Sequence, residues 1–180
     1  LPTTLPVSET TSLSTENYCA DYDDNRYTGT IPTQLGLLTK VTYIQLGSSC
    51  TSLSGRIPSE LGMLTAMAIY VDLHSNQLTG PTPTELGKLT KLGNTISLRN
   101  TLISGTVPTQ LGMLTAMTFG MYLYSTRITG TIPTELRHLN VGTLKLNNNK
   151  LFGIVPSEIG RMTKLDLLHL HNNSHLCGEL

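Results

Sequence analysis

Polar and aliphatic residues alternate around residues 72, 97 and 169, and the polar positions include side chains that could do chemistry. Asp72, His74 and Ser97 are the three residue types of a nucleophile–base–acid triad. A triad also needs oxyanion donors and an enclosed pocket, whereas alternation predicts an open strand surface. We therefore expect no enzyme activity from these residues, and assign them a binding role.

His169 and His171 are two residues apart and should face the same side of a strand. Two imidazoles can hold a metal ion, but a zinc site usually needs further protein ligands. His74 falls on the same face four strands away, or about 19 Å at the spacing of strands in a sheet. The sequence also lacks a GxGxxG or P-loop phrase. We therefore expect neither a metal ion nor a cofactor.

Composition argues against two classes of partner. The 180 residues carry 12 Lys and Arg against 12 Asp and Glu, so there is no basic field to attract nucleic acid or an anionic membrane. No run approaches the roughly 18 apolar residues of a membrane span. We expect no nucleic-acid partner and no direct membrane insertion. The chain starts at Leu1 and stops at Leu180 in mid-phrase, which suggests a processed product or a piece of a longer protein.

A fixed period organises the chain. An aliphatic residue or Thr followed by Pro recurs every 23 to 26 residues, at Ile31-Pro32, Ile57-Pro58, Thr82-Pro83, Val107-Pro108, Ile132-Pro133 and Val155-Pro156. This period lies in the range of leucine-rich repeats. The word LGMLTAM, at residues 61–67 and again at 111–117, places Leu61, Leu64 and Met67 at inward positions of the repeat, with Leu111, Leu114 and Met117 two periods later. We interpret this repeated segment as part of the structural frame of the solenoid, because each turn must present the same face to its neighbours.

Each period holds two short alternating segments. The first segments centre on Ile44/Leu46, Val71/Leu73, Ile96/Leu98, Met121/Leu123, Leu144/Leu146 and Leu168/Leu170. They predict six strands stacked about 4.8 Å apart in one parallel sheet. The second segments end at the recurrent proline, which lacks an N–H, and predict a second short strand in each period. An L-G-x-L-T segment then turns the chain round the back.

The combined pattern LxGxIPxxLGxLxxLxxLxLxxN resembles the plant-type, extracellular leucine-rich repeat of receptor-kinase ectodomains and polygalacturonase-inhibitor proteins; similar repeats occur in algal surface proteins. The resemblance covers residues 25–177, and residues 173–178 resemble the NxxLCG phrase that closes such arrays. It implies a β-rich right-handed solenoid with a parallel sheet on the concave face, and short second strands and turns or 3-10 segments on the other sides. It also implies an extracellular or cell-surface address, which a glycosylation sequon at Asn172 modestly supports.

The repeats depart from this pattern at three features. The family's ladder asparagine is kept at Asn25, Asn76, Asn149 and Asn173, whereas Thr51, Thr101 and Thr126 take its place in the other repeats. A hydroxyl offers fewer hydrogen bonds than an amide, so we expect a looser ladder there. Thr82 replaces a core aliphatic residue and predicts a local weak spot. One extra residue before the strand in repeats two to four predicts a stacked bulge.

We divide the chain into a degenerate N-terminal capping turn at residues 1–26, a solenoid of about six repeats at 27–173, and the start of a truncated C-terminal cap at 174–180. Residues 1–24 are rich in Thr, Ser and Pro, which also fits a flexible or glycosylated linker. Cys19 and Cys50 could bridge neighbouring turns, with Cys177 pairing beyond Leu180. Three free thiols fit the odd count equally well.

The outward strand positions form columns down the concave face, and the sequence varies most there. Tyr70, Tyr122 and Tyr124 are expected near Arg99. Exposed tyrosines beside an arginine anchor protein interfaces and stack on sugar rings, although tyrosine is also a good strand former. The predicted binding residues are Tyr43, Tyr70, Asp72, His74, Ser97, Arg99, Tyr122, Tyr124, Lys145, His169 and His171.

These residues predict a non-catalytic extracellular recognition or adhesion module whose concave face binds a protein, peptide or glycan. A second hypothesis is binding to ice or another ordered lattice through the hydroxyl ladders of the frame. Those ladders are Thr28, Ser54, Thr79, Ser104 and Thr129, and Thr33, Ser59, Thr84, Thr109, Thr134 and Ser157. Arg56 and Pro81 interrupt the column between them. A third hypothesis is self-association of solenoids as a wall, cell-surface or filament component.

Overall fold

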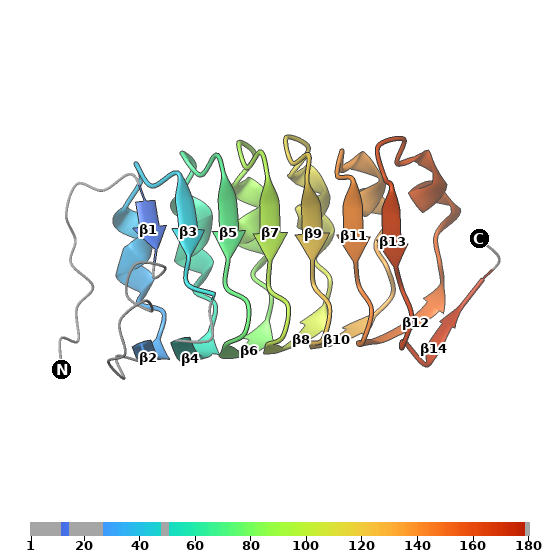
Figure 1. Cartoon of the computed structure of the whole chain (residues 1–180), viewed down its shortest axis with the longest axis horizontal. Helices are drawn as coiled ribbons and strands as arrows, with labels where there is room; N and C mark the ends of the chain where they lie inside the picture. The colour runs from blue at the N-terminus through green and yellow to red at the C-terminus, as the bar shows by residue number, and fades with distance from the viewer. Residues whose placement is uncertain (1–11, 15–26, 48–50, 179–180) are drawn as a thin grey trace.

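The computed structural model describes residues 12–14, 27–47 and 51–178 of the chain. The chain winds as a coil whose turns stack side by side (Figure 1). Each complete turn carries a strand of a first sheet, a strand of a second sheet and a 3-10 helix. No helix in the described ranges is long and apolar enough to cross a membrane.

The first sheet is parallel and follows the predicted register. Its strands are β1 (Ser12–Ser14), β3 (Tyr43–Gln45), β5 (Tyr70–Asp72), β7 (Thr95–Ser97), β9 (Gly120–Tyr122), β11 (Thr143–Lys145) and β13 (Leu167–His169), paired in that order. The six predicted strands are confirmed. β1 adds one more, and pairs with β3 through Ser12 opposite Tyr43. The rest of residues 1–26 lie outside the described ranges, so the capping turn stays a prediction.

The second sheet runs along another side of the coil, and its strands are also parallel. They are β2 (Tyr27–Thr30), β4 (Thr51–Arg56), β6 (Gln77–Pro81), β8 (Leu102–Thr106), β10 (Arg127–Gly130), β12 (Lys150–Ile154) and β14 (His175–Cys177). The predicted inward positions are buried: Leu78 has no exposed surface and Thr82 is 3% exposed. The predicted short second strands are therefore confirmed.

The 3-10 helices form the back of the coil (Figure 1). They are η2 (Thr33–Leu37), η3 (Ser59–Met63), η4 (Thr84–Lys88), η5 (Thr109–Met113), η6 (Thr134–His138) and η7 (Ser157–Arg161). Each follows directly on the recurrent proline, which has an extended backbone and is the N-cap residue of the helix. The inward residues of both LGMLTAM words are at most 1% exposed. The interpretation of that word as frame is confirmed.

The asparagine ladder ties neighbouring turns together where the asparagine is kept. Asn76 donates to the carbonyl oxygens of Leu46 in the preceding turn, at 2.8 Å, and of Leu73 in its own, at 3.1 Å. Its Oδ1 accepts from the Leu53 N–H at 2.9 Å. Thr101, in the same slot, donates only to Leu98 O within its own turn. The prediction of a looser ladder is confirmed at Thr101.

The extra residue forms the predicted stacked bulge. The N–H groups of Ala68 and Ile69 both donate to Thr42 O at 2.9 Å, so two residues face one. The next turn pairs one to one with these residues, because the Gly93 N–H donates to Ala68 O and the Asn94 N–H to Ile69 O.

Thr82 is the predicted weak spot, and its buried Oγ1 has no hydrogen-bond partner among the described residues. We expect Thr82→Val to stabilise the protein by about 1 kcal/mol, because it removes an unsatisfied hydroxyl while keeping the shape. Thermal unfolding should show a Tm about 2–4 °C higher. The exposed Thr84→Val is the control, expected within about 0.5 kcal/mol of the parent. No gain at Thr82 would contradict this account.

Two predictions concern residues of which little or nothing is described. Cys19 and Cys50 lie outside the described ranges, so their disulfide stays a prediction. Cys177 is exposed, and its Sγ lies 3.4 Å from Gly153 O.

Candidate functional site

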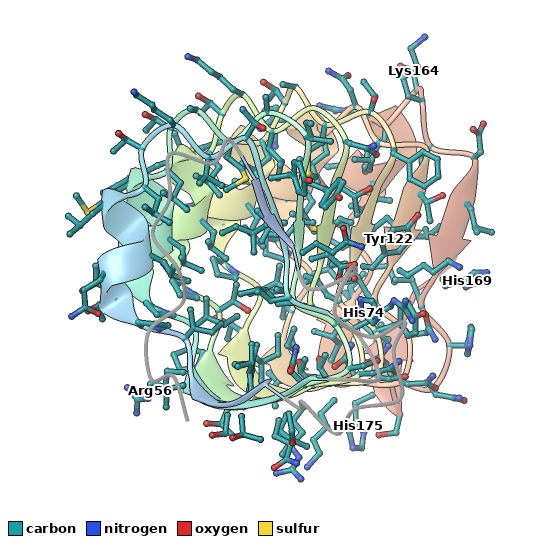
Figure 2. The ribbon with its side chains drawn as sticks, turned by 60° about the vertical axis from the view of Figure 1, so that its left-hand side comes forward. Arg56, His74, Tyr122, Lys164, His169 and His175 are labelled. Atoms are coloured by element: carbon teal, nitrogen blue, oxygen red, sulfur yellow. The ribbon has the colours of Figure 1, made fainter. Side chains whose placement is uncertain are left out.

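The concave face is here the face of the first sheet that points away from the core. Backbone pairing places Tyr70 beside Thr95 and Asp72 beside Ser97, so the predicted columns are those of the structure. His74, Tyr122 and His169 lie on the side of the molecule opposite the 3-10 helices (Figure 2). The sheet thus gathers side chains that are 23 to 27 residues apart in sequence.

At the N-terminal part of this face, the predicted binding residues contact one another. The rings of Tyr43 and Tyr70 lie 5.0 Å apart, and Tyr70 Oη donates to Gln45 Oε1 at 2.7 Å. His74 Nδ1 lies 2.6 Å from Asp72 Oδ1, and this carboxylate also accepts the His74 backbone N–H at 3.2 Å. The Asp72 carboxylate is therefore already engaged within the protein.

The centre of the face holds a tyrosine–cation cluster, formed by Arg99, Tyr122, Tyr124 and Lys145. Arg99 Nη1 donates to Tyr124 Oη at 3.2 Å, and the guanidinium carbon lies 5.8 Å from the centre of the same ring. Lys145 Nζ lies 5.9 Å from the Tyr122 ring centre and 6.0 Å from that of Tyr124. These are cation–π distances. Two cations and two aromatic rings therefore converge on one part of the sheet.

Tyr122 takes its position because Gly120 leaves room for it. A Cβ placed on Gly120 would lie 2.8 Å from both Cζ and Oη of Tyr122. The tyrosine therefore lies over its own strand's glycine. Glycine is a poor strand residue in general. At position 120, the absence of a side chain accounts for the orientation of the Tyr122 ring.

The charges of the cluster are not balanced by acidic side chains. The ion pair found in the described ranges joins His74 and Asp72. No carboxylate of the described residues lies within salt-bridge distance of Arg99 or Lys145. Both side chains are only partly exposed. The cluster is therefore a cationic spot on a chain with zero net charge.

Asn147 lies on the same face but is not among the predicted binding residues. It lies next to Tyr124 in its column, as the Ser125 N–H to Asn147 O bond shows. The residue is 7% exposed, and its Oδ1 has no hydrogen-bond partner among the described residues. Buried acceptors are nearly always satisfied. The sequence signal that could have identified Asn147 is its position between Tyr124 and His171 in the same column.

Other predicted residues are less accessible or stand apart. Ser97 is only 4% exposed, because it is a short side chain between the larger Asp72 and Tyr122 in its column. It is therefore a poor contact for a partner, contrary to the prediction. The rings of His169 and His171 lie 5.3 Å apart and are tilted by 58° to each other. In the ranges described, no three His, Cys, Asp or Glu side chains form a group suited to a metal ion.

Asn172 stays a predicted glycosylation site. It is exposed and adopts a positive φ of 57°, a conformation that asparagine tolerates well. Its Nδ2 donates to Asn148 Oδ1 at 2.6 Å.

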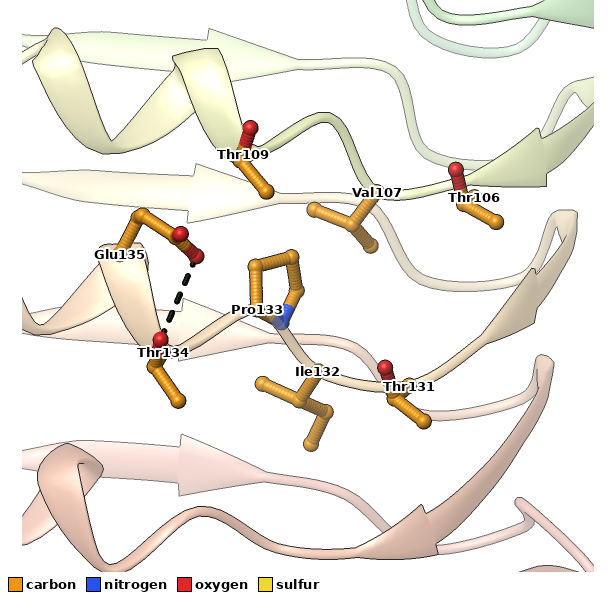
Figure 3. Close-up of a pocket in the computed structure, with 8 residues that line it drawn as sticks. All are labelled: Thr106, Val107, Thr109, Thr131, Ile132, Pro133, Thr134 and Glu135. Atoms are coloured by element: carbon orange, nitrogen blue, oxygen red, sulfur yellow. Dashed lines mark hydrogen bonds between the residues drawn. The ribbon is translucent and has the colours of Figure 1, made fainter.

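A hollow of about 400 Å³ lies away from the concave face, between two neighbouring turns (Figure 3). Its lining is Thr106, Val107, Thr109, Thr131, Ile132, Pro133, Thr134 and Glu135. Hydroxyls of the frame ladders on this side are mostly engaged within the protein. Thr134 donates to Glu135 at 3.4 Å, and Thr129 donates to Gly105 O of the preceding turn at 3.3 Å.

Comparisons with known proteins agree with this fold. A family model for the leucine-rich repeat matches residues 69–89 and 140–162. The chain is 34% identical to the ectodomain of the Arabidopsis thaliana receptor kinase GASSHO1/SCHENGEN3, solved with CASPARIAN STRIP INTEGRITY FACTOR 2, with a TM-score of 0.75 over 81% of this chain. It is 31% identical to the Arabidopsis receptor kinase HAESA, solved with the peptide hormone IDA and the co-receptor SERK1, with a TM-score of 0.73 over 88% of this chain.

The BIR2 ectodomain from Arabidopsis thaliana is 30% identical, with a TM-score of 0.59 over 69% of this chain and 64% of BIR2. The chain spans 17% of the GASSHO1/SCHENGEN3 structure and 25% of HAESA. A search of the curated proteins found no match. The chain is a leucine-rich-repeat solenoid, and its repeats are of the type found in plant receptor-kinase ectodomains.

Proposed function

We propose that the chain is a non-catalytic, extracellular recognition module that binds a peptide or a segment of a protein through its concave face. The observation that carries this proposal is the tyrosine–cation cluster. Tyr122, Tyr124 and Arg99 are the residue types that dominate binding energy at interfaces, and each is partly exposed on one polar face. The HAESA ectodomain, to which the chain is similar and which was solved with the peptide hormone IDA, supports the same class of partner.

The geometry of the sheet also favours an extended ligand. Successive strands offer neighbouring side chains at about 4.8 Å intervals along the solenoid. A peptide laid across β7, β9 and β11 can therefore contact side chains of several turns. A glycan could stack on the tyrosines, and is the alternative that the test below must separate.

The test is selection of binders from a displayed library of random peptides on the immobilised protein. We expect Tyr122→Ser and Tyr124→Ser each to weaken the selected peptides at least about tenfold. Phe152→Ser is the matched control, because Phe152 is an exposed aromatic residue on the second sheet, and should leave affinity unchanged. Equal loss in all three variants, or in none, would contradict a concave binding site. Capture of simple glycans instead of peptides would reassign the ligand class.

The lattice hypothesis has less support than peptide binding. Hydroxyls in both ladders donate to groups of the protein itself, as Ser54 does to Gly29 O and Thr84 to Glu85 Oε2, each at 3.2 Å. They are therefore engaged in the frame. Assembly into larger structures stays a prediction that mass measurement of the native material would test.

A further inference from the structure

The back of the molecule carries charges of both signs, because the last turns of three 3-10 helices hold Lys88, Arg137 and Arg161. Four glutamates, Glu60, Glu85, Glu135 and Glu158, lie in the first turns of 3-10 helices at the back. Each accepts a hydrogen bond from the Ser or Thr before it. The centre of the concave face presents Arg99 and Lys145, and no carboxylate of the described residues lies within salt-bridge distance of either. Its one predicted acidic residue, Asp72, is paired with His74. The field at this face therefore attracts anions, although the chain as a whole is neutral.

The two cations are also held in place before any ligand arrives. Arg99 is fixed by Tyr124 Oη, and Lys145 lies near both tyrosine rings. Gly120 in turn leaves the room that Tyr122 occupies. Side chains already held in place lose less entropy on binding. Partly buried cations form stronger hydrogen bonds with an anion than fully solvated ones do.

We propose that the ligand of the concave face is an acidic peptide, and that Arg99 and Lys145 bind one of its carboxylates over the ring of Tyr124. This inference rests on the proposed function and adds the chemical class of the ligand. A carboxylate of the ligand supplies the negative charge that is missing beside Arg99 and Lys145.

The test uses defined probes and NMR titration of the labelled protein. Three acetylated, amidated heptapeptides with alanine and serine flanks differ only in a central Glu, Gln or Lys. A fourth has a central Gln and a free C-terminus, which separates a chain-end carboxylate from a side-chain one. Glucuronic acid is the non-peptide carboxylate. We expect the Glu peptide to bind about tenfold more tightly than the Gln peptide, and the Lys peptide more weakly still.

Variants then separate charge from structure. Arg99→Gln and Lys145→Gln should each weaken the Glu peptide about five- to tenfold, whereas Arg99→Lys should restore part of the loss. Lys88→Gln is the control, because Lys88 is an exposed cation at the end of η4 on the back. It should bind as the parent does. Raising the ionic strength should weaken the Glu peptide and leave the Gln peptide nearly unchanged. Resonances of the other turns report whether each variant keeps its fold.

Each remaining outcome has a definite meaning. Equal binding of the Glu and Gln peptides at the concave face would overturn the acidic specificity while leaving the proposed function standing. Tighter binding of glucuronic acid than of the Glu peptide would overturn the assignment of the ligand as a peptide. If the Glu peptide at about 10 mM shifts no resonance of the cluster, the inference is overturned. Binders from the displayed library that ignore the concave face would overturn both proposals.

Discussion

Gly112→Ala is expected to destabilise the solenoid by about 3 kcal/mol. A Cβ at Gly112 would lie 2.3 Å from Glu135 O and 2.7 Å from Glu135 C, which are backbone atoms of the next turn. Backbone cannot move aside as a flexible side chain can, so η5 and η6 must separate. Overpacking a buried position typically costs 1–3 kcal/mol, and this contact is shorter than any that a real Cβ makes. The glycine of LGMLTAM is thus needed for close stacking of turns.

Gly160→Ala is the matched control for that variant. Gly160 occupies the corresponding position in η7, but a Cβ there meets nothing within 4 Å. We expect this variant to match the parent or to gain slightly, because alanine loses less backbone entropy than glycine on folding. Urea unfolding of both variants gives the comparison. Similar stabilities of the two alanine variants would refute the stacking explanation.

The second large effect is expected at the asparagine ladder. Asn149 is buried, and its Nδ2 donates to Leu123 O at 2.8 Å and Leu146 O at 3.0 Å. Its Oδ1 accepts from the Ile128 N–H and from the Thr126 hydroxyl. Asn149→Ala leaves these groups without partners inside the coil, where each costs about 1–3 kcal/mol. We expect a loss of about 4 kcal/mol in the free energy of unfolding.

Asn140→Ala provides the comparison for Asn149. Asn140 is exposed, and its Nδ2 makes a hydrogen bond of 2.9 Å to Thr115 O that water can replace. We expect its substitution to cost about 0.5 kcal/mol or less. Denaturant unfolding of the two variants under the same conditions measures the difference. A cost at Asn140 as large as at Asn149 would show that the ladder contributes nothing special.

Much of the fold could be predicted because one turn repeats. Once Val71 and Leu73 are assigned inward, the period fixes the corresponding residues of every other turn, and the structure has the same register. Thr82 and the bulge near Ile69 were predictable for the same reason, since both are visible as departures from a pattern.

The arrangement of the concave face could not be predicted in the same way. The contacts of Arg99 with Tyr124, and of Lys145 with both tyrosines, join residues on different strands at positions that follow no period. Which way a long side chain turns depends on its neighbours, and here on the space above Gly120. The unsatisfied acceptor of Asn147 likewise depends on its surroundings. Sequence columns therefore identify the candidates but not their contacts.

The central claim is that a partner binds at the tyrosine–cation cluster on the concave face. The most direct measurement is photo-crosslinking with a library-selected peptide that carries a photoreactive residue, followed by mass spectrometry of the crosslinked fragments. The account predicts crosslinks to residues of β7, β9 and β11 and to Tyr124. Crosslinks confined to the hollow around Thr106 and Thr131, or to the 3-10 helices, would contradict it.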